Sequence, residues 1–268
     1  MLKTEMRNPN TTHIDKMSTM EMLKAINEEN KNAVLAVENE LQAIGDAVDA
    51  LAAALKNGGR MFAMGAGTSG RLAVADAAEC PPTYGVSKDM FVGLIAGGDS
   101  CLRSAQEKVE DIGSCGVEDL KNHNLTGKDV VIGLSAAGGA SYVLQALSYA
   151  QSLGCTTIGI TSNKGSKLDL LADISICPDT GAEVITGSTR MKAGTAQKLI
   201  LNMLSTCAMV KNGYVYENLM INLKPSNAKL RQRIINIVTD VAKVTAEAAV
   251  EALDAHGWNI RETLDALK

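Results

Sequence analysis

The sequence predicts an α/β fold: a doubly wound, five-stranded parallel sheet with helical additions at the N- and C-terminal ends. In the middle of the chain, short apolar runs alternate with stretches of helical periodicity, the pattern of strands joined by crossover helices. A glycine-rich turn connects the first of these runs to a helix, at the place where such sheets bind ligands. Both ends of the chain show helical periodicity alone.

The N-terminal part, residues 1–57, is predicted to be an arm followed by helices. Residues 1–17 are polar and lack periodicity, so we expect an ordered arm or loop there. Ser18 and Glu21 have the spacing of a capping box. Apolar residues near a 3.6-residue period continue from there until two glycines end the helical stretch.

The central part, residues 58–225, is predicted to form the sheet and to bind the ligand. We expect strands at 60–65, 90–96, 129–135, 156–161 and 173–177. We expect helices at 69–79, 99–111, 140–153 and 191–212. The third strand is almost continuously apolar, as a strand buried on both faces should be. The C-terminal part, residues 226–268, is predicted to be helical, with one helix to Val244 and a smaller unit broken at Gly257.

Charge and composition exclude several classes of function. The 268 residues carry a net charge of −4 and only 3% aromatic residues, so we predict no nucleic-acid partner. No apolar run approaches the ~20 residues of a membrane span, and the N-terminus lacks the apolar core of a signal peptide. We therefore predict no membrane partner and a cytoplasmic location. The six cysteines and three histidines are scattered without metal-ligand spacing, so we predict no metal site and no disulfide.

The turn at 65–71, with the sequence GAGTSGR, is predicted to bind a phosphate. Its glycines let the backbone approach a ligand, and the start of the following helix favours an anion. We expect the ligand to lie against Gly67, Thr68, Ser69 and Gly70, where the two hydroxyls can donate to phosphate oxygens. The glycines also fit a dinucleotide motif. However, the next predicted strand ends in two glycines and not in the acidic residue that holds a ribose, which favours a compact phosphate.

Glu79 is a candidate acid–base residue because of its expected place at a helix end. It precedes Cys80 and two prolines, which are predicted to stop the helix that starts at the phosphate turn. The negative end of the helix dipole and desolvation would both disfavour its charged form, which suits general acid–base catalysis. These residues alone leave a solvated glutamate at a helix end as an equal alternative. On spacing alone, Glu107 and Glu110 are interpreted as a solvated acidic face of the predicted helix 99–111.

The segment 186–198 is dense in hydrogen-bond donors and cations, just before a long apolar helix. Ser188 is a candidate N-cap, and Thr189 adds a second hydroxyl. Arg190 and Lys192 are candidates to balance the charge of an anionic substrate. An ordinary capped helix with a basic face is the alternative, and the coincidence of glycine, hydroxyl and cation favours a binding role.

Three segments resemble the N-acetylmuramic acid 6-phosphate etherase family. They are GAGTSGRL at 65–72, DAAECPPTYG at 76–85 and EVITGSTRMKAGTAQK at 183–198. TEMRNPN at 4–10 and YENLM at 216–220 resemble the same family, so the resemblance covers nearly the whole chain. It implies a sugar-isomerase (SIS) fold and a homodimer, with no cofactor. The implied substrate is an amino-sugar phosphate.

The resemblance also implies a reaction and its residues. The family cleaves the lactyl ether of N-acetylmuramic acid 6-phosphate with water, giving N-acetylglucosamine 6-phosphate and D-lactate in cell-wall recycling. Its two acid–base glutamates match Glu79 and Glu110. We expect Glu79 to act on the proton at C2 of the ring-opened sugar, and Glu110 to serve the leaving lactate and the water.

One loop departs from the family pattern. Where the family has Ala-Ala-Ser-Gly-Arg-Thr-Pro-Tyr, this chain has SAAGGASY at 135–142. Ala137 stands in place of the serine, Gly139 in place of the arginine and Ala140 in place of the threonine. This loop is expected to hold the sugar phosphate, and Ser135 or Ser141 is the hydroxyl that we expect to contribute here, although neither stands at the position of the family's serine.

The altered loop favours a second interpretation, a non-catalytic sugar-phosphate sensor resembling the glucokinase regulatory protein. The presence of both glutamates favours the enzyme. An aldose–ketose isomerase of the same fold is a third alternative, which does not account for the E-C-P-P motif.

The helix from Ser69 to Glu79 also predicts how the site is assembled. About ten residues at 1.5 Å each separate its ends by ~15 Å, more than one sugar phosphate can span between phosphorus and C2. We therefore predict a homodimer with shared active sites, in which the phosphate turn of one subunit meets Glu79 of the other.

Overall fold

The computed structural model describes residues 2–268, which fall into two compact units. The first unit takes in the described residues up to Ala78 together with Asp89–Ala208. The second takes in Glu79–Lys88 and Met209–Lys268. The division runs within two long helices, and residues 209–225 belong with the C-terminal helices.

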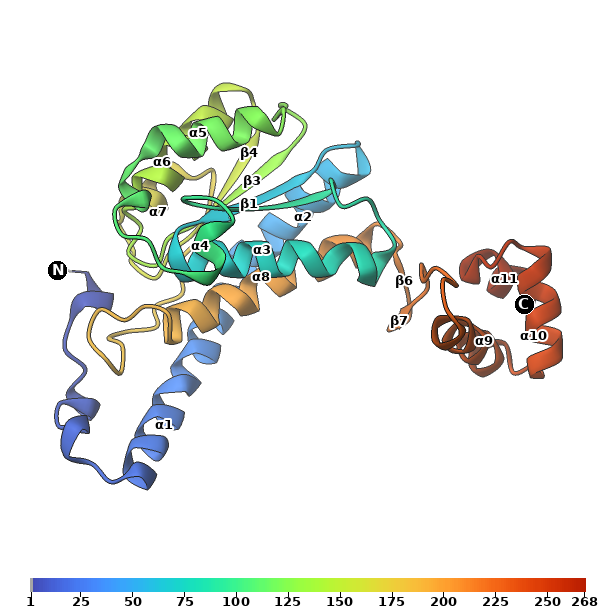
Figure 1. The fold of residues 1–268 in the computed structure, drawn as a ribbon, viewed down its shortest axis with the longest axis horizontal. Coiled ribbons are helices and arrows are strands. Elements are labelled where there is room, and N and C mark those ends of the chain that lie inside the picture. The colour runs from blue at the N-terminus through green and yellow to red at the C-terminus, as the bar shows by residue number, and fades with distance from the viewer. Residues whose placement is uncertain (1) are drawn as a thin grey trace. The chain divides into compact units, whose positions relative to one another are not determined.

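The first unit is built on a five-stranded parallel sheet with the strand order β2-β1-β3-β4-β5 (Figure 1). The strands are β1 (Met61–Gly65), β2 (Phe91–Ile95), β3 (Val130–Leu134), β4 (Thr156–Ile160) and β5 (Ile174–Ile176). All five predicted strands are confirmed. Gly65 pairs with Ile95 on one side and Leu134 on the other, so the carboxyl ends of the three strands meet at one edge.

Helices cover both faces of this sheet. Those that begin in the first unit are α1 (Thr19–Glu38), α2 (Leu41–Lys56), α3 (Gly67–Tyr84), α4 (Ser100–Arg103), α5 (Gly113–Asn122), α6 (Ser141–Ser152), α7 (Lys167–Leu171) and α8 (Lys192–Lys211). Helices α5 to α7 lie over one face, and α2 lies over the other with the first-unit parts of α3 and α8 (Figure 1). Gly133 lets α6 approach β3 closely, because a Cβ there would be 2.5 Å from Val143 Cγ1. The core between them is apolar, with Phe62, Met64, Val131 and Leu147 fully buried.

The N-terminal arm is ordered, as predicted, by contacts with distant loops. It makes three short 3₁₀ turns and then enters α1 through the predicted capping box of Ser18 and Glu21. Asn8 Nδ2 donates to Ala182 O at 3.0 Å, and Thr11 Oγ1 donates to Val184 O at 2.8 Å. The arm is therefore fixed along the loop that precedes α8.

The predicted helix over 99–111 is wrong. Helix α4 ends at Arg103, and the chain then continues without helix to a 3₁₀ turn at Val109–Asp111. Lys108 has a φ of 68°, a left-handed conformation that a right-handed helix cannot contain. Glu107 and Glu110 consequently do not share a helical face.

The predicted end of α3 at Glu79 is also wrong, because the helix continues through Pro81 and Pro82 to Tyr84. Each proline removes one N–H donor, but its fixed φ is compatible with a helix. Thr83 Oγ1 donates to Glu79 O at 2.7 Å, and Gly85 N donates to Pro81 O at 2.9 Å. These bonds help to carry the last turn past the prolines.

The second unit is a small helical body. It contains the two-stranded antiparallel pair β6 (Val215–Tyr216) and β7 (Leu219–Met220), with α9 (Ala228–Ala242), α10 (Ala246–Ala255) and α11 (Ile260–Ala266). Ile234, Val238, Leu253 and Ile260 form its fully buried core. The predicted break at Gly257 is confirmed, and residues 213–222 contribute the hairpin that the sequence did not predict.

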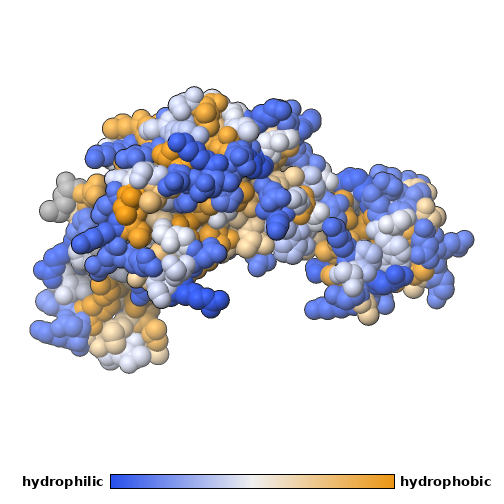
Figure 2. Space-filling model, turned by 45° about the horizontal axis from the view of Figure 1, so that its top comes forward, coloured by the Kyte–Doolittle hydropathy of each residue, from blue (hydrophilic) through white to orange (hydrophobic). Residues whose placement is uncertain are grey.

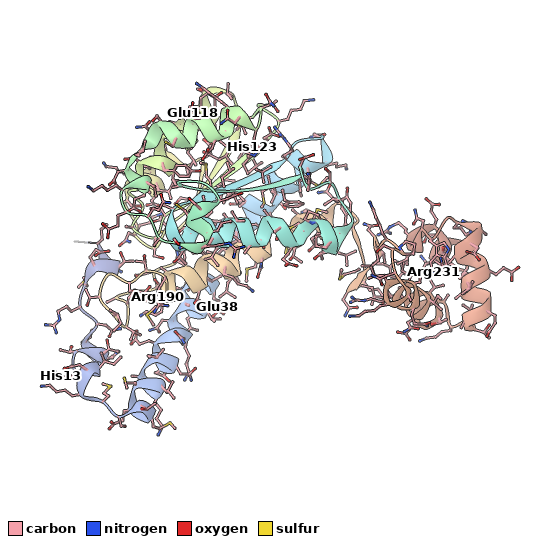
Figure 3. All side chains as sticks on the ribbon, viewed as in Figure 1. His13, Glu38, Glu118, His123, Arg190 and Arg231 are labelled. Atoms are coloured by element: carbon pink, nitrogen blue, oxygen red, sulfur yellow. The ribbon has the colours of Figure 1, made fainter. Side chains whose placement is uncertain are left out.

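Two other features bear on function. Over residues 2–268, no helix combines the length and apolar character needed to cross a bilayer. His13 lies on the N-terminal arm and His123 at the end of α5, in different parts of the first unit (Figure 3).

Candidate active site

A cavity of about 240 Å³ opens in the first unit, beside the carboxyl ends of β1 and β3. It is lined by Glu5, Ala66, Ser69, Glu110, Leu134, Ser135, Ala136, Ala137, Ala140, Gly187 and Thr189. The structure thus brings together four segments singled out in the sequence: the turn after β1, the acidic segment before α5, the loop after β3 and the loop before α8. This convergence makes the cavity the candidate active site.

The turn after β1 places one hydroxyl at the cavity. Of the four residues expected to bind phosphate there, only Ser69 lines the cavity. Gly67, with a φ of 54°, starts the helix, and Gly70 fits tightly because a Cβ would lie 2.5 Å from Gly65 O. Thr68 packs against α8, since a Cβ at Gly194 would lie 3.3 Å from its methyl carbon. The other three residues therefore shape the turn around Ser69.

Ser69 has a partner that the sequence reasoning did not assign. Its Oγ donates to Oε1 of Gln197 at 2.9 Å, and both side chains are buried. Gln197 lies on the first turns of α8, within the motif that carries the family resemblance. No local pattern identifies it, because the contact joins segments 128 positions apart.

The loop after β3 lines the cavity with one polar side chain, Ser135, and otherwise with alanines, so backbone groups make up much of its surface there. Ser135 Oγ accepts from Gly138 N at 3.2 Å, and Gly138 has a φ of 72°. Ala137 and Ala140 line the cavity. Ala140 is the N-cap of α6 and provides no side-chain cap. Helices α3 and α6 both begin at the cavity, and their positive dipole ends favour an anion there.

In the loop before α8, the expected N-cap role of Ser188 is wrong. The helix begins four positions later, at Lys192, and the buried carboxylate of Glu183 caps it. Glu183 accepts from Lys192 N at 3.0 Å and from Ala193 N at 2.9 Å. Thr189 lines the cavity and Arg190 is exposed beside it in the same loop (Figure 3).

Lys192, a candidate in the sequence to balance the charge of a substrate, does not line this cavity and is paired with a carboxylate in the interior. The residue is 1% exposed, and its Nζ lies 2.5 Å from Glu29 Oε2. Asn10 Nδ2 donates to the other oxygen of Glu29 at 2.8 Å. Burial raises the pKa of Glu29, but the hydrogen bonds from Asn10 and Lys192 outweigh it and hold that pKa below its usual value. The ion pair therefore joins α1, the arm and α8.

The two candidate glutamates have different surroundings. Glu110 lies on the 3₁₀ turn at Val109–Asp111 and lines the cavity. Glu79 is exposed on the part of α3 that belongs to the second unit. Because α3 continues to Tyr84, the argument that placed Glu79 at the negative helix end no longer applies.

Glu5 is a further carboxylate at the cavity, and its position was not foreseen. The arm holds it there: Asn163 Nδ2 donates both to Thr4 Oγ1 at 3.0 Å and to Ala136 O at 2.9 Å. Glu5 Oε2 lies 3.2 Å from the position that a Cβ at Gly187 would take. The only sequence signal was the family resemblance of the segment 4–10.

Comparison with known proteins finds matching domain families and relatives that cover nearly the whole chain. The model of the SIS domain matches residues 116–206, and that of the glucokinase regulatory protein N-terminal SIS domain matches residues 43–151. The chain is 53% identical over 258 residues to N-acetylmuramic acid 6-phosphate etherase 2 of Vibrio parahaemolyticus, covering 95% of this chain and 86% of that protein. It is 51% identical over 261 residues to N-acetylmuramic acid 6-phosphate etherase of Escherichia coli, covering 97% and 88%.

Solved structures show the same fold at low sequence identity. Phosphoheptose isomerase from Neisseria gonorrhoeae superposes with a TM-score of 0.54 at 18% identity, covering 71% of this chain and 99% of that chain. Together with the SIS domain match, this likeness confirms the predicted α/β fold.

Proposed function

The chain belongs to the N-acetylmuramic acid 6-phosphate etherase family, and from this membership we propose how its residues perform the reaction. The protein is a carbon–oxygen lyase that cleaves the D-lactyl ether of N-acetylmuramic acid 6-phosphate with water. The observation that carries the proposal is that Glu110, Ser69, Ser135 and Thr189 line one cavity at which two helices begin.

In the proposed binding mode, the phosphate lies at the starts of α3 and α6. The hydroxyls of Ser69, Ser135 and Thr189 donate to its oxygens, and Arg190 balances its charge. Hydrogen bonds to a charged group contribute about 1.5–3 kcal/mol each, so three hydroxyls account for much of the affinity. Glu5 and Glu110 are carboxylates and accept hydrogen bonds, so they face the hydroxyl and amide groups of the sugar.

The chemistry proceeds by elimination and then addition. Glu79 takes the C2 proton of the ring-opened aldehyde, and the electrons left on C2 form the double bond to C3 as the C3–O bond breaks. Glu110 gives its proton to the leaving lactate oxygen and then takes one from the attacking water, whose oxygen bonds to C3. Glu79 returns its proton to C2, giving N-acetylglucosamine 6-phosphate and D-lactate.

Substitution of each glutamate separates the two half-reactions. In Glu79→Gln, we expect neither lactate release nor exchange of the C2 proton with deuterated water. In Glu110→Gln, we expect lactate release to fall by at least ~100-fold, the usual contribution of general acid–base catalysis, while C2 exchange persists. Glu107→Gln is the matched control, because Glu107 is exposed on the same segment and does not line the cavity. Full turnover by either catalytic variant would remove that glutamate from the mechanism.

The complete site is further proposed to form in a homodimer in the cytoplasm. Support comes from Glu79, which stands on the same helix as Ser69 yet does not line the cavity that holds Ser69. Apolar surface on α1 supports association with a second copy: Met20, Leu23, Val34 and Leu35 are each more than half exposed and share one helix face (Figure 2). The absence of disulfides among residues 2–268 suits a reducing compartment.

Mixing two inactive variants tests the shared site. Glu79→Gln and Ser69→Trp each damage one half of it, so hybrid dimers should regain one working site if the halves come from different chains. No recovery after verified subunit exchange, or full activity in an obligate monomer, would contradict the shared site.

The sensor and isomerase alternatives are less well supported. Relatives that are about half identical over nearly the full chain carry the etherase name, and both glutamates are present. An assay of lactate release from N-acetylmuramic acid 6-phosphate distinguishes the enzyme from a sensor, which would bind the sugar phosphate without releasing lactate.

A further inference from the structure

We propose that Gln197 is a positioning residue, whose side-chain amide aims the hydroxyl proton of Ser69 at the bound anion. The inference rests on the proposed phosphate-binding role of Ser69. Gln197 is buried on α8 and does not line the cavity, so its position alone does not indicate this function.

The first step concerns the single proton of the Ser69 hydroxyl. In the structure, Ser69 Oγ donates to Oε1 of Gln197 at 2.9 Å. A hydroxyl has one proton to donate, so in this arrangement it offers only lone pairs to the cavity. An anion such as phosphate accepts hydrogen bonds and gains nothing from those lone pairs.

The second step concerns the other end of the amide. Nε2 of Gln197 is buried and has no hydrogen-bond partner among residues 2–268. An unpaired buried N–H donor is costly, and an unpaired carbonyl oxygen is better tolerated. The two ends of a glutamine amide are almost the same shape, so a half-turn exchanges them at little steric cost.

The half-turn resolves both problems at once. Nε2 then donates to Ser69 Oγ, so the unpaired donor gains a partner. The Ser69 hydroxyl no longer gives its proton to the amide and can donate it to a phosphate oxygen in the cavity. The bound anion and the rotated amide therefore favour each other, because in both the Ser69 hydroxyl proton points to the cavity.

The chemistry of the side chain explains why glutamine is suited to this position. Glutamate has nearly the same shape but only accepts hydrogen bonds when ionised, so it would hold the Ser69 proton and add a negative charge near the anion. Methionine has a similar length and no N–H donor, so it would not set the direction of the Ser69 hydroxyl proton.

A double-mutant cycle on affinity tests the proposal. The affinity for N-acetylglucosamine 6-phosphate is measured by calorimetry for the wild type, Ser69→Ala, Gln197→Met and the double variant. We expect about a tenfold loss for each single variant and no further loss in the double variant, because Gln197 acts only through Ser69. The same loss should appear in KM with little change in kcat, since the phosphate lies away from the reacting carbons.

Two further variants control for structural effects. Thr195→Ala lies on the same turns of α8, is exposed and does not line the cavity, so its affinity should equal that of the wild type. If Gln197→Met does not fold, as judged by thermal melting, the cycle is repeated with the isosteric Gln197→Glu, where the expected loss exceeds tenfold and is smaller in the Ser69→Ala background.

The outcomes separate this inference from the proposed function. Independent losses, reaching about a hundredfold in the double variant, would overturn the role of Gln197 while leaving Ser69 in the phosphate site. Unchanged affinity in Ser69→Ala would instead overturn the phosphate site itself, and the inference with it.

Discussion

The turn after β1 and the loop after β3 occupy matching places in the fold and differ in what surrounds their serine hydroxyls. Each connects a buried strand to a helix that begins at the cavity. The first contributes a buried hydroxyl, Ser69, which is held by Gln197 on α8. The second also contributes a buried hydroxyl, Ser135, but Ala137 and Ala140 line the cavity beside it, and Gly139 lies between them in sequence.

The two glycines at these places show the same difference in packing. A Cβ at Gly70 would lie 2.5 Å from Gly65 O and 2.6 Å from Ile95 Cγ1. A Cβ at Gly139 would have no atom within 4 Å. The comparison shows that the backbone of the first turn is tightly packed at Gly70 and that the Ser69 side chain is held in one position by Gln197. The second has room for a side chain at Gly139 but not at Gly138, where a Cβ would lie 2.1 Å from Ser166 Oγ, and it relies on the start of α6.

The largest expected effect comes from filling the first turn. Gly70→Ala places a methyl group against backbone and a β-branched side chain, and overpacking of this kind costs about 3 kcal/mol of unfolding free energy. Gly139→Ala in the second loop is the matched control, expected to change the unfolding free energy by less than about 0.5 kcal/mol. Chemical denaturation followed by circular dichroism measures both. Equal effects would mean that the two connections are packed alike.

A smaller effect is expected from adding a cation to the second loop. Gly139→Arg enters open space next to the cavity, so it should fold normally and strengthen the affinity for N-acetylglucosamine 6-phosphate by about tenfold, or ~1.5 kcal/mol. The gain should shrink as salt is raised, because part of it is electrostatic. Gly139→Gln supplies the matched neutral side chain. If calorimetry finds the same affinity for all three proteins, the phosphate does not lie near this loop.

Features that depend on neighbouring residues could be predicted from the sequence. The five strands were found because each is a short, nearly continuous apolar run between turn residues, a signal that is local. Ser69 was singled out because strand–turn–helix connections of parallel sheets bind ligands at one edge, and Ser135 because its loop resembles the phosphate loop of the family; both line the cavity. The inferences on the strands and on Ser69 need only neighbouring residues and the general rules of the fold, whereas the one on Ser135 also needed the family resemblance.

The errors arose where contacts outside the pattern considered decide the outcome. Lys192 resembles a substrate-binding cation in its own segment, but its partner Glu29 lies 163 positions away in sequence. The cap of α8 comes from Glu183 and not from the nearer Ser188. The left-handed Lys108 and the helical Pro81 each contradict the usual local preference of the residue type. For Lys192 a tertiary contact outweighed the local pattern, whereas the bonds that carry α3 past Pro81 are local.

The smallest expected effect comes from capping α6, and it separates stability from binding. Ala140 occupies the N-cap and provides no side-chain acceptor. Ala140→Thr supplies one, which should stabilise the helix start by about 1 kcal/mol. Ala140→Val has the same branched shape without the hydroxyl and is the matched control. A higher denaturation midpoint for threonine than for valine is the expected result.

Affinity should respond less than stability to this change. The threonine hydroxyl oxygen accepts from an N–H in the first turn of its own helix, and that N–H then no longer points to the anion. The hydroxyl proton remains available to the phosphate, so one donor is lost and one is gained. We therefore expect the affinity for N-acetylglucosamine 6-phosphate to stay within about twofold of the wild type. A tenfold gain without added stability would instead mean that the threonine contacts the phosphate directly. In that case the side chain at position 140 would join the Ser135 hydroxyl as a ligand of the phosphate.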